Sequence, residues 1–293
     1  MIKAPKNLLL PVIFLLCFQI NSFAQGTQMN IDPDADFKLA KELYQKDQYS
    51  LAFPLFKVIA QGVSPYSKLP ISTQLEARYY TIVCGLKLNE TSAENAAIEF
   101  IDLEHHTPRI EMLSFQLGEY YYRRQNFIDA MAYFEKAGIN NLSNREIAEM
   151  KFHQAYGYFT MQQFEKAKPL FNSIRQMASD PNNLDANYYF GFISFYEKDY
   201  KLALESFRKV ENHETYQKIV PYYITEILYF NGDKDKAIKY GEEKLAKGNQ
   251  YYDLQLKQLI GHAYFEKKKL CQSIALLRRI CCQSREGAPR RFI

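Results

Sequence analysis

The chain has 293 residues, of which 47% are hydrophobic, and its 12 glycines and 11 prolines exclude a low-complexity or collagen-like protein. It contains 23 tyrosines and 21 phenylalanines but no tryptophan, which indicates that rings pack between its helices. The formal net charge of +4 comes from the two ends, because residues 25–269 hold 30 Lys and Arg against 32 Asp and Glu. A nucleic acid is therefore not an expected partner.

The first 24 residues have the features of an export signal. Two lysines precede an apolar run from Leu8 to Ile20, and residues 22–24 offer a small-x-small cleavage site. A membrane anchor is the alternative, but the run of about 13 residues is shorter than the ~20 that span a bilayer. We expect residues 1–24 to be a signal peptide. The mature chain, which has no later transmembrane segment, is then expected in the periplasm or at the cell surface.

After a linker at residues 25–35, residues 36–269 repeat a unit of two short helices joined by a charged turn. A small residue in the first helix is followed twelve positions later by a small residue in the second, and four positions further on by an aromatic ring. Small residues let two antiparallel helices approach closely while the ring fills the space beside them. The four clear copies are Ala40/Ala52/Phe56, Gly118/Ala130/Phe134, Ala155/Ala167/Phe171 and Gly191/Ala203/Phe207.

Weaker copies fill the intervals between the clear ones. They are anchored at Gly85 and Thr225, and a last copy begins around Gly261. Two sequences predict helix starts with capping boxes, Thr91-x-x-Glu94 and Ser143-x-x-Glu146. One hairpin cannot bury its own apolar faces, so the pattern predicts an all-α stack of such units.

The repeat resembles the tetratricopeptide repeat (TPR). The fullest match is Leu117-Gly118-x-x-Tyr121 followed by Ala130, Phe134 and Ala137, and the poorest unit is 74–104. The resemblance covers about residues 36–269, with about six complete units and the start of a seventh. It implies a right-handed superhelix of helix–turn–helix repeats that holds a peptide or protein in a concave groove. With the export signal, the chain is similar to exported bacterial TPR proteins.

The resemblance also implies which residues line the groove, since the first helix of each TPR unit faces it. By repeat position these are Phe152, Tyr156, Phe159, Tyr188, Phe192, Phe195, Tyr196, Tyr222, Glu226, Tyr229 and Phe230. Ordinary packing between repeats is the alternative role for many of these rings. Tyr156 and Phe192 are the most informative, because their repeat position usually carries a polar residue. The Lys/Asn clamp of TPR adaptors for chaperone tails is missing.

No sequence motif points to catalysis, a cofactor or a metal. His105 and His106 are adjacent near a helix end, which favours capping over metal binding, and His153, His213 and His262 are scattered among the repeats. Cys84 stands alone on a predicted helix. We therefore expect no enzyme activity, no cofactor and no metal.

The tail at residues 270–293 departs from the repeat. Leu270, Ser273 and Leu277 stand where the repeat has an aromatic, a small and an apolar residue, and the composition then turns rich in Arg and Cys. We interpret this tail as the product of a single-nucleotide frameshift, because a shifted reading of permitted codons restores Tyr, Ala and Leu at these places. A naturally divergent terminal cap is the alternative. The nucleotide sequence distinguishes the two.

Two functional interpretations from different classes follow. The leading one is a non-enzymatic protein–protein interaction scaffold of the cell envelope that binds a peptide or protein segment in an aromatic-lined concave groove. The alternative is a truncated N-terminal fragment of a longer TPR protein whose specificity or catalytic region is lost. An envelope enzyme with converging histidines and acids is the least favoured interpretation.

Overall fold

The structure is a computed structural model that describes residues 33–268 and 272–277. Within these residues every regular element is helical, which confirms the expected all-α class. The contacts divide the chain into two compact units that meet between Cys84 and Gly85, inside helix α4 (Ile71–Leu88). No described helix combines the length and the apolar character that crossing a membrane requires.

The first unit contains one helical hairpin and most of α4. Its elements are α2 (Pro33–Gln45), α3 (Tyr49–Gln61), the 3-10 turn η2 (Tyr66–Lys68) and the part of α4 up to Cys84. Ala40 and Ala52 are fully buried where α2 meets α3, and the buried ring of Phe56 stacks on Tyr80 of α4 with centroids 4.9 Å apart. The Phe56 ring thus joins the hairpin to the next helix.

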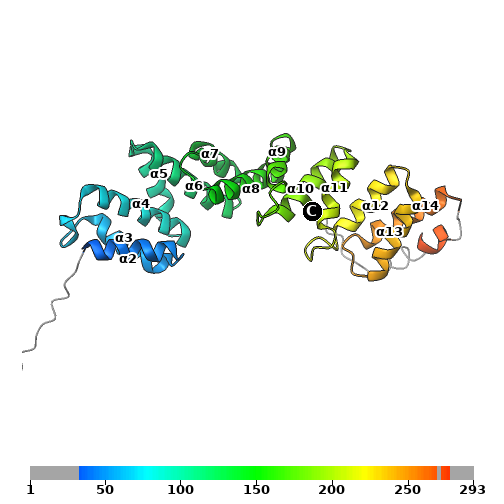
Figure 1. Ribbon diagram of the computed structural model, residues 1–293, viewed down its shortest axis with the longest axis horizontal. Helices are drawn as coiled ribbons and strands as arrows, with labels where there is room; N and C mark the ends of the chain where they lie inside the picture. The colour runs from blue at the N-terminus through cyan, green and yellow to red at the C-terminus, as the bar shows by residue number, and fades with distance from the viewer. Residues whose placement is uncertain (1–32, 269–271, 278–293) are drawn as a thin grey trace, which may run out of the picture. The chain divides into compact units, whose positions relative to one another are not determined.

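The second unit is a series of helical hairpins. Its helices after α4 are α5 (Ala93–Leu103), α6 (Thr107–Arg123), α7 (Phe127–Ala137), α8 (Asn144–Thr160), α9 (Phe164–Arg175), α10 (Asn183–Tyr196), α11 (Tyr200–Val210), α12 (Val220–Phe230), α13 (Lys234–Lys247) and α14 (Asp253–Glu266). Figure 1 shows α6 with α7, α8 with α9, α10 with α11 and α12 with α13 as packed pairs. The aromatic residue that precedes each second small anchor is the first residue of its helix at Phe127, Phe164 and Tyr200.

The residues assigned to repeat packing lie inside these pairs. Phe134, Phe171 and Phe207 are at most 1% exposed. The other assigned residues are also buried, namely Ala40, Ala52, Phe56, Gly118, Ala130, Ala155, Ala167, Gly191, Ala203 and Gly261. A Cβ atom added to Gly118 would lie 2.6 Å from Cδ1 of Phe134, so the helices are as close as the ring allows.

The turns after α2, α6, α8, α10, α12 and α14 carry a left-handed residue at the same place, seven positions after the first anchor, whereas the left-handed Asn89 after α4 comes four positions after Gly85. The residues at the shared place are Asp47, Gln125, Gln162, Lys198, Gly232 and Lys268, with φ between 57° and 83°. The next N–H then bonds back across the helix end: Asn126 donates to the Tyr121 carbonyl at 3.0 Å, and Asp199 to the Ser194 carbonyl at 2.8 Å. This is the Schellman ending, in which one left-handed residue satisfies the last carbonyls of a helix.

The two predicted capping boxes have different outcomes. At the start of α8 the Ser143 side chain accepts from the Glu146 N–H while the Glu146 carboxylate accepts from the Ser143 N–H, so this prediction is confirmed. The Thr91/Glu94 prediction is wrong. There the Glu94 carboxylate accepts from the hydroxyls of Tyr120 and Tyr121 on α6, which removes it from the helix start.

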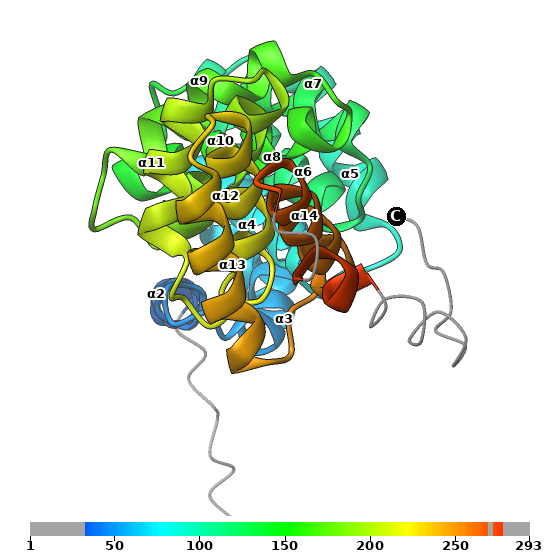
Figure 2. The ribbon, with the colours of Figure 1, turned by 90° about the vertical axis from the view of Figure 1, so that its right-hand side faces the viewer.

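The seventh unit continues beyond α14. Residues 272–277 are helical, Ser273 is buried, and Leu277 lies 3.5 Å from the Cβ position of Gly261. Figure 2 shows this turn in red beside α14. Ser273 and Leu277 thus occupy the positions that the repeat assigns to a small and an apolar residue. Leu270 and residues 278–293 lie outside the described residues, so the frameshift stays a prediction.

Gly118→Ala should destabilise the protein even though alanine favours a helix by about 1 kcal/mol over glycine. The new methyl group would overlap the buried Phe134 ring, and such overpacking costs about 1–3 kcal/mol. Urea unfolding followed by circular dichroism measures the change. Gly191→Ala is the matched comparison, because its nearest ring atoms on Phe207 are 3.0 Å away and the cost should be smaller. Equal or greater stability of Gly118→Ala would contradict the close approach.

Candidate functional site

A continuous row of aromatic rings runs across the first helices of the second unit, from α6 to the start of α14. Successive ring centroids are 4.9–6.1 Å apart, the separation at which edge-to-face pairs attract each other. We call this set the aromatic row, and its members in order are Tyr122, Tyr156, Tyr189, Phe159, Phe192, Tyr223, Tyr222 and Tyr252. All except the buried Tyr223 are half-buried, so each of these seven rings retains some contact with solvent.

Several residues predicted for the groove lie in this row. Tyr156 and Phe159 of α8, Phe192 of α10 and Tyr222 of α12 are half-buried members of it. Phe195 lies next to the row, with its ring 5.2 Å from Tyr223. The structure thus places these five side chains together on the first helices, and their role as a groove stays a prediction.

Other predicted residues lie elsewhere. Phe152 is only 8% exposed and packs edge-on against Phe171, so it contributes to packing between helices rather than to an exposed surface. Tyr188 stacks on Tyr216, which precedes α12, with centroids 4.4 Å apart. The remaining three lie at helix ends: Tyr196 is 67% exposed, Phe230 is 55% exposed and stacks on Tyr200, and Tyr229 donates a hydrogen bond to Glu266.

Four members of the row were not predicted, namely Tyr122, Tyr189, Tyr223 and Tyr252. Tyr189 and Tyr223 each follow a predicted tyrosine directly, in the pairs Tyr188-Tyr189 and Tyr222-Tyr223. Adjacent residues on a helix point about 100° apart, so one ring of each pair meets the preceding hairpin and the other the following one. The two adjacent tyrosines in each pair are the sequence signal from which Tyr189 and Tyr223 could have been predicted.

The central part of the row is acidic. Helices α10 and α12 contain one carboxylate each, Asp185 and Glu226, and no Lys or Arg. Asp185 accepts a hydrogen bond from Tyr216, and Glu226 accepts one from Tyr222. Burial raises the pKa of Tyr188 to about 12, and burial also raises the pKa of Tyr189 and Tyr222. These phenols stay neutral near pH 7, and the Tyr222 hydroxyl donates its hydrogen bond to Glu226.

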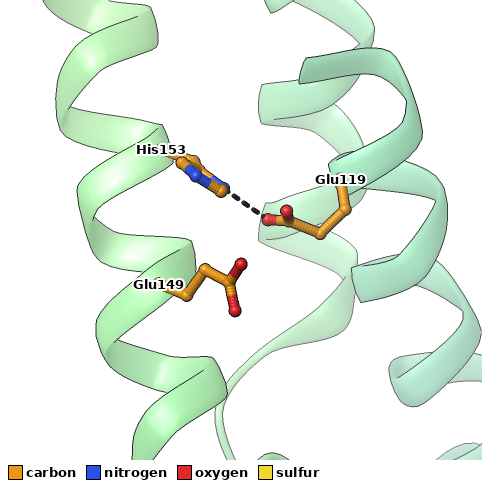
Figure 3. A group of neighbouring side chains, drawn as sticks. All are labelled: Glu119, Glu149 and His153. Atoms are coloured by element: carbon orange, nitrogen blue, oxygen red, sulfur yellow. Dashed lines mark hydrogen bonds and ion pairs between the residues drawn. The ribbon is translucent and has the colours of Figure 1, made fainter. Parts of the chain in front are cut away.

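A cluster of titratable side chains lies at the α6 end of the row. His153 on α8 stacks on Tyr122, with centroids 3.9 Å apart, and its Nδ1 lies 2.7 Å from Oε1 of Glu119 on α6. Glu149, one helical turn before His153, directs its carboxylate toward the same space (Figure 3). In the sequence His153 stands alone among the repeats, whereas the structure gives it two acidic neighbours.

The other candidates for chemistry are not arranged for it. Cys84 is buried, and burial raises the pKa of its thiol to about 12, so the nucleophilic thiolate is disfavoured. His105 and His106 are exposed, and the His106 side chain makes no capping bond to the start of α6. Their backbone N–H groups donate to the Glu104 carboxylate instead. Glu104 thus holds the turn between α5 and α6 through these two N–H groups.

Glu226→Gln should stabilise the protein at pH 7, and the gain should disappear as the pH falls toward 4. Burial raises the pKa of Glu226, although the Tyr222 hydrogen bond opposes this in part. A raised folded-state pKa means that the stability contribution of Glu226 is complete below its unfolded pKa of about 4.3 and is lost as the pH rises through the folded value. Thermal unfolding of the native protein and the variant from pH 4 to pH 8 tests this. Glu165→Gln, at an exposed position, is the control. The prediction would be contradicted if the difference in stability between the native protein and Glu226→Gln did not change with pH.

Comparisons with known proteins support the fold. No protein-family model and no curated protein sequence matches the chain. Among solved structures, the apo form of RapI matches 88% of this chain and 77% of its own at 13% identity, with a TM-score of 0.54. MamA (AMB-1) matches 61% of this chain and 93% of its own at 16% identity, with a TM-score of 0.50.

A tetratricopeptide repeat protein from Parabacteroides merdae matches 85% of this chain and 91% of its own at 10% identity, with a TM-score of 0.46. Likeness at such low identity concerns the fold alone. RapI and MamA are both TPR-type repeat proteins. The described part of the chain therefore has the all-α, TPR-type repeat fold that its sequence pattern predicts.

Proposed function

We propose that this protein is a non-enzymatic scaffold that binds a segment of another protein along the aromatic row. The observation that carries the proposal is the continuity of the row, whose rings touch from α6 to α14 while most stay half-buried. Tyrosine and phenylalanine provide large contact areas at a small cost in conformational entropy, as binding surfaces require. Packing between repeats needs buried rings, but it does not need a solvent-accessible row.

The charges next to the row indicate the chemistry of the bound segment. Asp185 and Glu226 lie on helices without Lys or Arg, and the buried Glu119 lies beside Tyr122 at one end. Carboxylates and ring faces both attract cations. A segment that alternates Lys or Arg with apolar side chains suits this surface better than an acidic one. The proposed ligand is therefore a basic, partly aromatic peptide segment.

We also propose that binding takes place in the cell envelope. Residues 1–24 support this location through their two lysines, apolar run and small-x-small site, and they lie outside the described residues. Fractionation of cells that express the native gene tests the location. Recovery of a shortened chain from the envelope or periplasm is expected, and recovery of the full-length chain from the cytoplasm would contradict it.

Tyr156→Ala and Phe192→Ala should each weaken binding of a peptide segment without loss of the helical fold. Short random peptides displayed on phage provide the probe, and selection on the native protein should enrich sequences rich in Lys, Arg and aromatic residues. Loss of one anchoring ring should raise the Kd of an enriched peptide about tenfold or more, as measured by fluorescence polarisation. Circular dichroism checks that both variants remain helical.

Tyr133→Ala is the matched control for this experiment. Tyr133 is also half-buried, but it lies on the second helix α7 and stacks on Tyr121 outside the aromatic row. Its substitution should leave the Kd unchanged. If no peptide is enriched, or if Tyr156→Ala and Phe192→Ala bind the enriched peptides as well as Tyr133→Ala does, the proposed binding surface is wrong.

A further inference from the structure

We propose that Glu119, Glu149 and His153 form a binding site for a divalent metal ion of the zinc type. Glu119 comes from α6, whereas Glu149 and His153 come from α8. Each residue offers a ligand atom, and these atoms all lie within 4.8 Å of one another. The inference does not depend on the proposed function, because the convergence of these three side chains does not require that the aromatic row binds a peptide.

The backbone holds the three side chains in a convergent arrangement. Glu149 and His153 are four residues apart on one helix, so they lie on the same face one turn apart. Glu119 meets them from the neighbouring first helix, with its Oε1 2.7 Å from Nδ1 of His153. Figure 3 shows the three side chains directed into the space between the two helices. Sites built from facing helices with an acid and a histidine on one turn are a known way to bind metal in helical proteins.

The cluster contains two carboxylates, and the structure pairs one of them, Glu119, with His153. The Glu119 side chain is 5% exposed and the His153 side chain 17% exposed. Among residues 33–268 and 272–277, no Lys or Arg forms an ion pair with Glu119 or Glu149. His153 contacts Glu119, and Glu149 forms no hydrogen bond or ion pair within the described residues. A divalent cation would give the half-buried Glu149 carboxylate a partner while it also balances the charge of the buried Glu119.

The ligand types select the class of metal. An imidazole nitrogen with two carboxylate oxygens suits zinc and similar transition-metal ions, whereas Ca²⁺ and Mg²⁺ prefer oxygen ligands alone. With bonds of about 2.0–2.1 Å, tetrahedral ligands lie about 3.3 Å apart. To bind an ion, Oε1 of Glu119 and Nδ1 of His153 must move slightly apart. The carboxylate of the half-buried Glu149 must move closer to them, which its rotatable side chain allows. Tyr122 stacks on His153 and holds the ring in place.

Three protein ligands leave one position open. The cluster lies at the α6 end of the aromatic row, since Tyr122 and Tyr156 contact each other beside it. A bound ion would therefore keep a coordination position for water or for a donor atom from outside the chain. The ligand set is that of an open metal site rather than of a closed structural one.

The test measures Zn²⁺ and Co²⁺ binding to the untagged, full-length protein. Cys17, Cys271, Cys281 and Cys282 are first replaced by serine, because free thiols also bind these ions. Isothermal titration gives the stoichiometry and Kd for Zn²⁺, and the visible absorption of Co²⁺ reports its ligands. We expect one equivalent per chain, with Mg²⁺ binding far more weakly.

Glu149→Gln and His153→Asn should each weaken Zn²⁺ binding at least about tenfold and change the Co²⁺ spectrum. Glu149→Gln is the decisive variant, because Glu149 forms no hydrogen bond or ion pair within the described residues and its loss should not disturb the fold. His262→Asn replaces an exposed histidine on α14 and is the matched control that should keep native binding. No stoichiometric Zn²⁺ binding, or equal affinity in Glu149→Gln and His262→Asn, would overturn the proposal.

Discussion

The close approach of two helices beneath a phenylalanine ring is the constraint on which the rest of the structure depends. At Gly118 and Gly191 the nearest ring atoms lie only 2.6–3.0 Å from the position a Cβ would take. This contact fixes how far apart the helices of a pair lie and at what height along each helix they meet. The ring itself is fully buried, so the hydrophobic gain of the hairpin is concentrated there. The other aromatic contacts build on hairpins already fixed in this way.

The turns complete the constraint because they set the register between the paired helices. One left-handed residue seven positions after the anchor ends the first helix, and the next helix begins two residues later. Most of these residues are not glycine, and a left-handed conformation costs a non-glycine residue roughly 1–2 kcal/mol. The hairpin contacts outweigh this cost at Gln125, Gln162 and Lys198. Turn composition is thus subordinate to helix packing in this chain.

Much of the fold could be predicted because it repeats. The anchors and the hairpin pairs followed from a twelve-residue spacing, and the Ser143 capping box followed from local chemistry. The Thr91 box failed because Glu94 finds better partners on the next hairpin, and Phe152 is buried against Phe171 of its own hairpin. Such choices depend on which neighbour a side chain meets. Local sequence does not contain that information.

The candidate site shows which sequence separation does predict the neighbours of a side chain. Contacts across the first helices join residues about one repeat length apart: Tyr122 meets Tyr156, Tyr156 meets Tyr189, and Glu119 meets His153 across 34 positions. Short catalytic and metal motifs have spacings of a few residues, so a search for them passes over such pairs. In a repeat protein the relevant separation is the period itself. Applied to this chain, that rule brings together both the aromatic row and the acid–histidine cluster, which are therefore two products of one geometric repeat.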